Sequence, residues 1–469
     1  MDIQRRFIGR VSLPAYAWLK GTTAQFRHLR EFEASQRLPV DEIRARQLSR
    51  LRALVDHAYR RCPYYRERYD RAGVVPSDLR SLEDLNAFPI LDKGDIRAHG
   101  DDMVSSDWPE GDLIPNYTGG STGTPLEFYL SRDRKDSRWA ATVRHNRWAG
   151  WDLGERVAYF WGAISDGPAP GGWRRRLRHA LLEPQLFLNT ANLTEAGMAG
   201  FNEAMKRFRP NVVLAYARSA AMIARYLRAR GIPAYRPRAI VTSAEMLEPE
   251  DRQVIQEVFG CPVFNRYGCR EVSVIASECE ERRGLHTMAE CLHVEIVRDG
   301  KLAEAGQDGE ILVTDLANLA MPLIRYRIGD VGAWEGGRCE CGRELPRLRH
   351  VAGRATDFLV GHDGRMVSGP FLTLAAVGVR PSIGQLQIEQ ERIGQVHFRI
   401  KRGSRFQAAE DLEFLVAAAR TYLGETAEVG WEFVDEIPSE ASGKFLFCKS
   451  KVSPAFLRDS IEASGADRK

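Results

Sequence analysis

The sequence lacks several features that would place it at once in a broad class of proteins. No apolar run approaches the roughly 18 residues of a membrane-spanning helix. The net charge is only +4 over 469 residues, so the whole chain gives no case for nucleic-acid binding. Eight cysteines do not suggest a disulfide scaffold in a chain of this length, and the N-terminus lacks the compact apolar core of a secretory signal. A reducing cytoplasm is therefore the expected compartment.

Residues 1–40 form a basic and aromatic segment. Its charged and aromatic side chains include Arg5, Arg6, Phe7, Tyr16, Trp18, Lys20, Phe26, Arg27 and Arg30. Two interpretations remain open: an arm packed on the main domain, and a segment that rests on an anionic membrane surface. The packed arm is favoured because the apolar residues do not form one clean helical stripe.

Hydrophobic periodicity predicts alternating strands and helices between about 115 and 270. Helical spacing marks residues 41–61, 133–148, 198–208, and the stretches around 223–227 and 254–259. Strand-like runs occupy residues 157–161, 212–214, 239–242 and 262–264. This order predicts an α/β fold with a largely parallel sheet.

The pattern changes after residue 270. Strands are expected at 293–297 and 310–314, which gives a β-rich region appended to the α/β part. Past residue 353, strands at 385–390, 395–400 and 429–433 and a helix at 410–423 indicate a small α+β domain. The expected organisation is an arm (1–40), a large domain (41–353), a hinge (354–357) and a small C-terminal domain (358–469).

A loop of small residues precedes a strand-like run at 126–130. Its members are Thr118, Gly119, Gly120, Ser121, Thr122, Gly123 and Thr124. Successive backbone N–H groups in such a loop can bind an anion, and glycine lets the backbone approach a ligand closely. The loop is not the P-loop of ordinary NTPases, because Thr124-Pro125 stands where Lys-Ser/Thr would be required. Phosphate binding and a plain surface turn both remain open.

Two polar motifs directly follow predicted strands. They are Ser243-Ala244-Glu245 and the stretch Asn265-Arg266-Tyr267-Gly268-Cys269-Arg270-Glu271. Ligands bind beyond the carboxyl ends of the strands in an open α/β sheet, so both motifs would face the glycine loop. A carboxylate beside bound phosphate can hold Mg²⁺, which makes Glu271 a metal candidate, with a solvated surface glutamate as the alternative.

Three further residues stand in short polar runs toward the C-terminus. Asp330 ends the run Ile324–Asp330 and could accept both hydroxyls of a ribose, or simply form an Asp turn. Arg354 and Asp357 lie at the inferred domain boundary. Lys444, within Ser439–Phe445, is either a solvated surface charge or a group that stabilises negative charge on a ligand.

Four soft ligands are spaced in a way that permits a metal site. They are Cys279, His286, Cys339 and Cys341, and Cys291 is the main rival ligand. Three thiolates and one imidazole complete the tetrahedral shell of a structural zinc ion. Gly336, Gly337 and Gly342 give the second cysteine pair the loop freedom that a metal knuckle needs. The alternative is a set of unligated thiols with one histidine on a turn.

Taken in order, the motifs resemble the acyl-adenylate-forming (ANL) superfamily. The six motifs are the glycine loop, Ser-Ala-Glu, Tyr-Gly-x-x-Glu, Arg-Tyr-Arg-x-Gly-Asp, Gly-Arg-x-x-Asp and a C-terminal Gly-Lys. Within the superfamily the chain is similar to the phenylacetate–CoA ligase family, and to its CapK-like branch from capsular-polysaccharide gene clusters. That resemblance implies layered α/β sheets with a β-rich subdomain, and a small mobile C-terminal domain.

The resemblance also implies a reaction with ATP, Mg²⁺, a carboxylic acid and CoA. An acyl-adenylate would form first, and the CoA thiol would then displace AMP. An amine, a hydroxyl or a carrier-protein thiol is the alternative acceptor, and a homodimer is left open. Tyr159, Trp161 and Tyr216 could stack an aromatic acid or be ordinary core residues.

Site roles follow from the same resemblance. Thr118–Thr124 would hold the β- and γ-phosphates, and Glu271 the Mg²⁺. Ser243–Glu245 with Asn265–Tyr267 would line the adenine, and Gly268 would belong to the same nucleotide-binding set. Asp330 and Arg354 would bind the ribose, Lys444 would bridge carboxylate and α-phosphate, and Asp357 would be the hinge. The cysteine–histidine set would be a structural zinc site. The chain departs from many family members in having Thr124 for lysine and Arg270 for threonine, and we expect the Arg270 guanidinium to contact phosphate.

Overall fold

The structure is a computed structural model, and it describes most of the chain. The described residues are 3–117, 126–161, 181–189, 195–354, 358–363, 366–368, 372, 380, 382–403, 405–438, 446 and 448–452. The predicted phosphate loop at 118–125, the hinge residue Asp357 and the lysine Lys444 lie outside them.

A parallel sheet forms the centre of the α/β part. Its strand order is β4 (Gln185–Asn189), β3 (Val157–Trp161), β5 (Val212–Tyr216), β6 (Ala239–Ser243), β7 (Val263–Cys269). The pairs β3–β4, β3–β5, β5–β6 and β6–β7 are all parallel. The predicted α/β class with a largely parallel sheet is therefore confirmed for this region.

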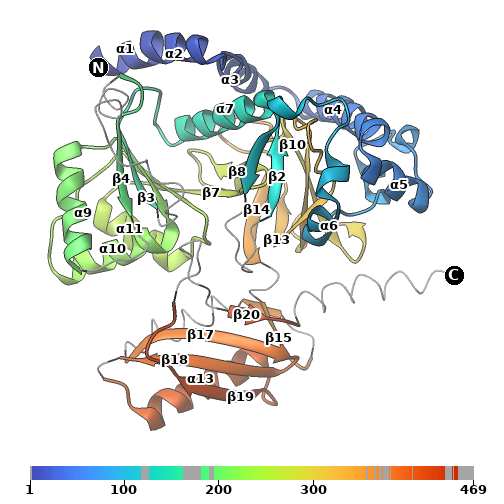
Figure 1. Ribbon diagram of the computed structural model, residues 1–469. Coiled ribbons are helices and arrows are strands. Elements are labelled where there is room, and N and C mark those ends of the chain that lie inside the picture. The colour runs from blue at the N-terminus through green and yellow to red at the C-terminus, as the bar shows by residue number, and fades with distance from the viewer. Residues whose placement is uncertain are drawn as a thin grey trace.

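Helices cover one face of the parallel strands, as Figure 1 shows at its left. They are α9 (Glu195–Phe208), α10 (Ala217–Ala229) and α11 (Pro249–Phe259). Their apolar sides and alternate residues of the strands form one core cluster. The other residues of the same strands form a second, smaller cluster with Ala149 and Trp151, because successive strand residues point to opposite faces.

Strand β7 joins the parallel strands to an antiparallel region of the same sheet. It pairs in antiparallel fashion with β8 (Ser273–Glu278). The sheet continues through β9 (Leu285–Thr287), β14 (Arg347–Arg354), β13 (Tyr326–Glu335), β12 (Gly309–Asp315), β10 (Leu292–Arg298) and β11 (Lys301–Leu302). The predicted β-rich region is thus part of one twelve-stranded sheet. The expectation that β7 would end near residue 264 was wrong, because pairing with β8 extends it to Cys269.

The N-terminal segment is helical and packs on the large domain. It comprises α1 (Ile3–Phe7), η1 (Ile8–Ser12), α2 (Leu13–Lys20) and α3 (Ala24–Ser35). Helix α3 lies along α7 (Arg132–Trp148), where the rings of Phe26 and Trp139 meet edge to face with centroids 5.3 Å apart. The packing agrees with the arm interpretation of residues 1–40.

Further helices connect the arm to the sheet. They are α4 (Val40–Arg61), α5 (Pro63–Ala72), η2 (Pro76–Asp78), η3 (Glu83–Ala87), α6 (Lys93–Met103) and η4 (Glu110–Asp112). A small hairpin, β1 (Ile114–Tyr117) with β2 (Glu127–Leu130), flanks the glycine loop. Within the described part of the chain, every helix is too short or too polar to span a bilayer.

The C-terminal region has a sheet and a core of its own, below the large domain in Figure 1. The strand order is β19 (Glu428–Phe433), β18 (Gln395–Arg402), β17 (Ile383–Arg392), β20 (Cys448–Ser450), with α13 (Ala408–Leu423) packed on it. A two-stranded piece, β15 (Phe358–Val360) with β16 (Met366–Ser368), adjoins it. The predicted α+β character is confirmed; the three short strands were not predicted, because three residues are too few for a periodic pattern.

Candidate functional site

Glu271 sits in the turn between β7 and β8, and its carboxylate is buried. The side chain accepts a hydrogen bond from the hydroxyl of Tyr326 on β13 at 2.7 Å, and the residue is only 4% exposed. Gly268 lets the two strands meet, since a Cβ there would lie 2.4 Å from the carbonyl oxygen of Ser273. The turn therefore holds a fixed, largely desolvated carboxylate.

Two cationic side chains from helices reach the same turn, and sequence reasoning missed both. The Nζ of Lys93, at the start of α6, lies 4.0 Å from the Glu271 carboxylate. Arg138 of α7 donates to the backbone carbonyls of Arg270 and Glu271. Burial lowers the pKa of Arg138 to about 9, and the neighbouring Arg134 acts in the same direction. Arg270 is exposed on the turn itself.

The helix that carries Lys93 begins with a well-formed cap. Asp92 accepts from the backbone N–H groups of Gly94 and Asp95, and Asp95 accepts from that of Asp92. This capping box fixes the first turn of α6 and hence the origin of the Lys93 side chain. The sequence Asp92-Lys93-Gly94-Asp95 was the signal that could have drawn attention to this residue.

Asp330 is joined directly to the Tyr-Gly motif. The Tyr267 hydroxyl donates to its carboxylate at 2.6 Å, and burial together with Asp330 raises the pKa of Tyr267 well above its ordinary value. Asp330 lies on β13, four residues from Tyr326, so one strand supplies a partner to both Tyr267 and Glu271. The alternative of a simple Asp turn is wrong, because Asp330 is a paired strand residue.

The Ser-Ala-Glu motif ends strand β6 beside the other predicted residues. Ser243 pairs in register with Tyr216, and Thr242 pairs with Asn265. Ala244 takes a left-handed conformation with φ +70°, which costs an alanine roughly 1–2 kcal/mol and is typical of functional turns. Three neighbouring strands thus present polar groups at one edge of the sheet.

Arg266 points to the opposite side of β7 from Asn265 and Tyr267, since strand neighbours alternate. Its guanidinium donates to the side-chain oxygen of Asn146 at 2.5 Å, and its Nε has no hydrogen-bond partner. Arg266 is 8% exposed, and it forms no ion pair with any carboxylate of the described chain. Burial lowers its pKa to about 10.

The predicted aromatic residues share that sheet face with Arg266. The rings of Trp161 and Tyr216 lie 4.5 Å apart between centroids, and Tyr159 stacks near Phe187. Burial raises the pKa of Tyr159 to about 12. This face therefore combines three large aromatic side chains with one buried cation.

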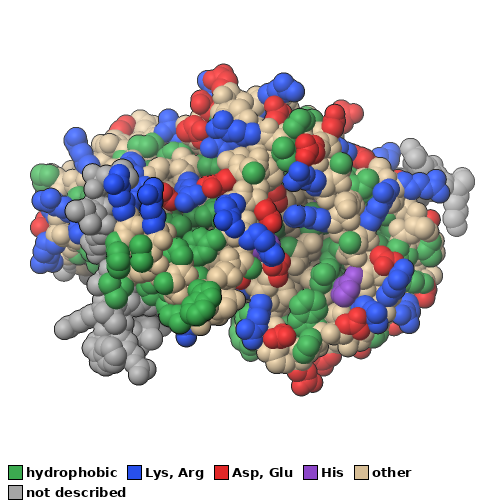
Figure 2. Space-filling view, turned by 90° about the horizontal axis from the view of Figure 1, so that it is seen from above, with side chains coloured by type: hydrophobic (Ala, Val, Ile, Leu, Met, Phe, Trp, Pro, Cys, Tyr) green, Lys and Arg blue, Asp and Glu red, His purple; other side chains and the backbone are tan. Residues whose placement is uncertain are grey.

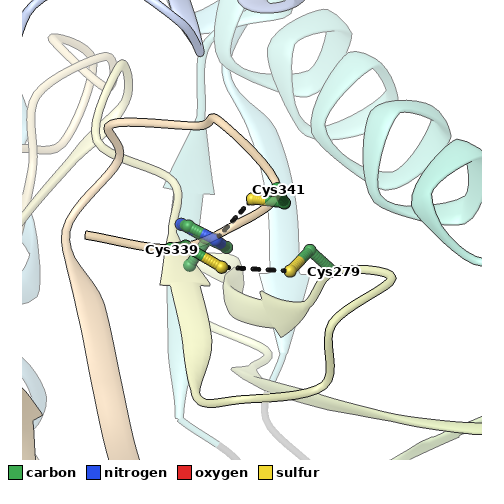
Figure 3. A group of neighbouring side chains, drawn as sticks. Cys279, Cys339 and Cys341 are labelled. Carbon is green, nitrogen blue, oxygen red and sulfur yellow. Dashed lines mark hydrogen bonds between the residues drawn. The ribbon is translucent and has the colours of Figure 1, made fainter.

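The four predicted metal ligands come together in space. The loop after β8 brings Cys279, β9 brings His286, and the loop between β13 and β14 brings Cys339 and Cys341. Their ligand atoms all lie within 4.8 Å of one another, and Figure 3 shows the three labelled cysteines gathered in one place. The rival Cys291 lies outside this set, buried near Arg134 and Asp315.

The cluster has the dimensions of a tetrahedral site. The sulfurs of Cys279 and Cys339 are 3.7 Å apart, and the Cys341 sulfur lies 3.3 Å from Nε2 of His286. A tetrahedral Zn²⁺ requires about 3.8 Å between two sulfurs and about 3.6 Å between sulfur and nitrogen. Gly337 and Gly342 both take positive φ, near 73°, in the knuckle loop.

The surroundings of the cluster orient its ligands. His286 uses Nδ1 to bond the Leu345 carbonyl at 3.0 Å, which leaves Nε2 directed at the sulfurs. Burial lowers the pKa of His286 to about 4, so the imidazole is neutral at pH 7. Burial opposes ionisation of Cys341, but hydrogen bonds from Arg343 hold the pKa of that thiol below its ordinary value. A bound cation would also ionise Cys279, whose pKa burial raises to about 12.

Three parts of the predicted site stay predictions. The glycine loop Thr118–Thr124, Asp357 and Lys444 lie outside the described residues. Only the backbone of Arg354 is described, and it pairs with Asp330 on the neighbouring strand.

Three comparisons with known proteins agree with one another. The family model for the CapK C-terminal domain matches residues 359–451. A phenylacetate–coenzyme A ligase of Thermus thermophilus is 29% identical over 335 residues, which are 69% of this chain and 73% of that ligase. The protein CapK of Staphylococcus aureus is 24% identical over 388 residues, 79% of this chain and 81% of CapK.

Solved structures share the fold over nearly the whole chain. The crystal structure of 2-hydroxyisobutyryl-CoA ligase in the postadenylation state, in complex with its acyl-AMP, superposes with a TM-score of 0.70. The superposition covers 92% of this chain and 94% of the ligase at 20% sequence identity. This likeness confirms the fold class, including a separate C-terminal domain.

Proposed function

We propose an activity for this chain from its family: it belongs to the acyl-adenylate-forming superfamily, in the branch of the phenylacetate–CoA ligases and CapK. The chain is an AMP-forming ligase that activates a carboxylic acid with ATP. The acid carboxylate attacks the α-phosphate, and pyrophosphate leaves. The CoA thiol then attacks the acyl carbon, and AMP leaves with its electron pair on the phosphate oxygen. The observation that carries this proposal is the pair of hydrogen bonds that join β13 to β7 and its following turn, Tyr326 to Glu271 and Tyr267 to Asp330.

Charge neutralisation around the Glu271 turn supports the first step. Phosphoryl transfer is catalysed mainly by positioning and by neutralising phosphate charge. Glu271 would hold Mg²⁺, which supplies positive charge between the phosphates when bound. Lys93 lies 4.0 Å from Glu271 and Arg270 is exposed on the same turn, so both can meet the triphosphate of ATP. The glycine loop Thr118–Thr124 would cradle the β- and γ-phosphates through its backbone.

The strand edge supports binding of the nucleoside. Asp330 keeps a carboxylate oriented by Tyr267, and the two ribose hydroxyls can donate to it. Arg354 pairs with Asp330 in register and would add a donor near the ribose. Ser243–Glu245 stand at the end of β6, Asn265 lies on the adjacent β7, and these residues would line the adenine.

Lys444 and Asp357 take their roles from the family. Lys444 would bridge the acid carboxylate and the α-phosphate during adenylation. Rotation of the C-terminal domain about Asp357 would then remove Lys444 and admit the thiol, so one site performs two steps. The separate core of residues 359–448 is compatible with such a rotation. The relatives that are named as CoA ligases favour CoA over an amine, a hydroxyl or a carrier protein.

The acid is proposed to combine an aromatic or apolar body with a second hydrogen-bond acceptor. Tyr159, Trp161 and Tyr216 offer stacking surface. Arg266 is buried on the same sheet face without a carboxylate partner among the described residues, so it would gain most from an acceptor or anionic group on the substrate.

The cysteine–histidine cluster is proposed to hold a structural zinc ion. Four protein ligands close the shell, which is typical of structural and not of catalytic zinc. The site ties the β8–β9 loop to the β13–β14 loop, beside Trp148 and Leu345, and it is separate from the Glu271 turn.

An ATP–pyrophosphate exchange screen tests the activity. Aryl, short-chain and sugar acids are offered with the purified full chain, and those that give exchange are then supplied with CoA or with amines. We expect exchange with at least one acid class and release of AMP with CoA as the acceptor. ATP binding without exchange for any acid would contradict the proposal.

A further inference from the structure

The N-terminal arm has a second apolar face that the large domain does not cover. Trp18 and Leu19 are each 73% exposed, and Phe7 and Val11 are about half exposed. These positions recur at helical spacing along α1, η1 and α2 and so fall on one side of the segment. No other stretch of the described chain exposes four large apolar side chains within 13 residues.

The opposite side of the same segment is anchored. Ile8, Leu13 and Ala17 are buried. Arg5 forms ion pairs with Asp152 and Glu155 of the large domain. The segment therefore packs on the protein through one face and presents the other to the surroundings, so its apolar residues make two stripes instead of one.

The charged side chains of the segment itself are all basic. Arg6, Arg10 and Lys20 are exposed in this segment, and residues 3–30 contain no aspartate or glutamate. Figure 2, which is seen from above the arm, shows hydrophobic side chains interspersed with basic and acidic ones over that side of the molecule. A helical segment with apolar residues on one side and only cations beside them is the pattern of an interfacial membrane helix.

We propose that α1, η1 and α2 dock the protein on an anionic lipid surface. Phe7, Val11, Trp18 and Leu19 insert at the level of the headgroups, where tryptophan is favoured, and the exposed cations Arg10 and Lys20 meet the lipid phosphates. The exposed charges argue against a second copy of this chain as the occupant, because a two-fold contact would place like charges together. The proposal is independent of the ligase activity.

The test is co-sedimentation of the full chain with vesicles. We expect binding to phosphatidylcholine vesicles that contain about 30% phosphatidylglycerol, little binding to pure phosphatidylcholine, and weakening as salt rises from about 0.05 to 0.3 M. Trp18→Ser with Leu19→Ser should weaken binding at least about tenfold, and Arg10→Glu with Lys20→Glu should do the same.

A matched control removes comparable side chains elsewhere. Trp431 and Met222 are exposed large apolar residues away from the arm, so Trp431→Ser with Met222→Ser should bind vesicles like the parent. Thermal unfolding of each variant checks that the fold is intact. Unchanged binding by both arm variants, or no binding of the parent to anionic vesicles, would overturn the proposal. Conversion of a dimer to a monomer by Trp18→Ser with Leu19→Ser, without lipid binding, would assign the face to self-association instead.

Discussion

The hydroxyl of Tyr326 on β13 donates to the carboxylate of Glu271 at 2.7 Å, in a turn between two strands that are not neighbours of β13 in the sheet. The bond fixes a carboxylate that is almost fully desolvated. A group held in this way loses little freedom when it coordinates a cation beside the phosphates, which is the condition for efficient electrostatic catalysis.

Replacement of Glu271 should therefore act on chemistry more than on folding. Glu271→Gln keeps the size and the contact to Tyr326 but removes the charge, and we expect pyrophosphate exchange to fall by about a hundredfold or more. Tyr326→Phe should have a smaller effect, about tenfold, since the carboxylate stays in place but loses one donor. Pyrophosphate-exchange rates over a range of Mg²⁺ concentrations measure the effects of both substitutions. A normal exchange rate for Glu271→Gln would contradict the role of Glu271 in holding Mg²⁺.

Lys93 is expected to contribute to phosphate binding. Lys93→Ala should raise the KM for ATP and lower the exchange rate by about tenfold, and Lys93→Arg should retain part of the activity because the charge is kept. Lys135, an exposed lysine on α7, provides the control as Lys135→Ala. The KM for ATP and the maximal exchange rate of Lys93→Ala and Lys135→Ala are compared by varying the ATP concentration. Equal behaviour of Lys93→Ala and Lys135→Ala would count against a role in the site.

The cysteine cluster predicts bound zinc in the purified protein at about one ion per chain. Cys339→Ser should abolish it and lower the midpoint of thermal unfolding, because metal binding is linked to folding. Cys291→Ser is the matched control, since Cys291 is also buried but lies outside the cluster. Elemental analysis reads the metal content directly. Absence of zinc from the parent protein, or its retention in Cys339→Ser, would exclude the assignment.

Arg266 predicts a preference among acids. Arg266→Met removes the charge but keeps an apolar stem, so acids with a second acceptor group should lose exchange by about tenfold to a hundredfold. The exchange rate with purely apolar acids should be unchanged or higher, because a buried cation no longer faces them. The ratio of exchange rates for the two acid classes measures the effect. A uniform loss for all acids would indicate a structural role for Arg266 only.

Much of the fold and of the site was accessible from the sequence. Alternating strands and helices predicted the parallel sheet around β5 and β6, and the spacing of Cys279, His286, Cys339 and Cys341 predicted their meeting. The strands and helices follow from periodicity that is local in sequence. The meeting of the cysteines and the histidine follows from residue types that share one characteristic chemistry, metal binding.

Other features depend on tertiary contacts that no local pattern records. Lys93 and Arg138 reach the Glu271 turn from helices more than 130 positions upstream, and neither belongs to a motif. The side of β7 that Arg266 takes follows from the extension of that strand by β8. The second apolar face of the arm becomes visible only once the first is seen to be buried.

The most direct test of the two-step account separates the steps with Lys444. The parent chain and Lys444→Ala are compared in pyrophosphate exchange with an active acid, and in thioester formation from the supplied acyl-adenylate and CoA. We predict that Lys444→Ala loses exchange by at least about a thousandfold and keeps thioester formation near the parent rate. Equal loss of both steps, or normal exchange, would contradict it.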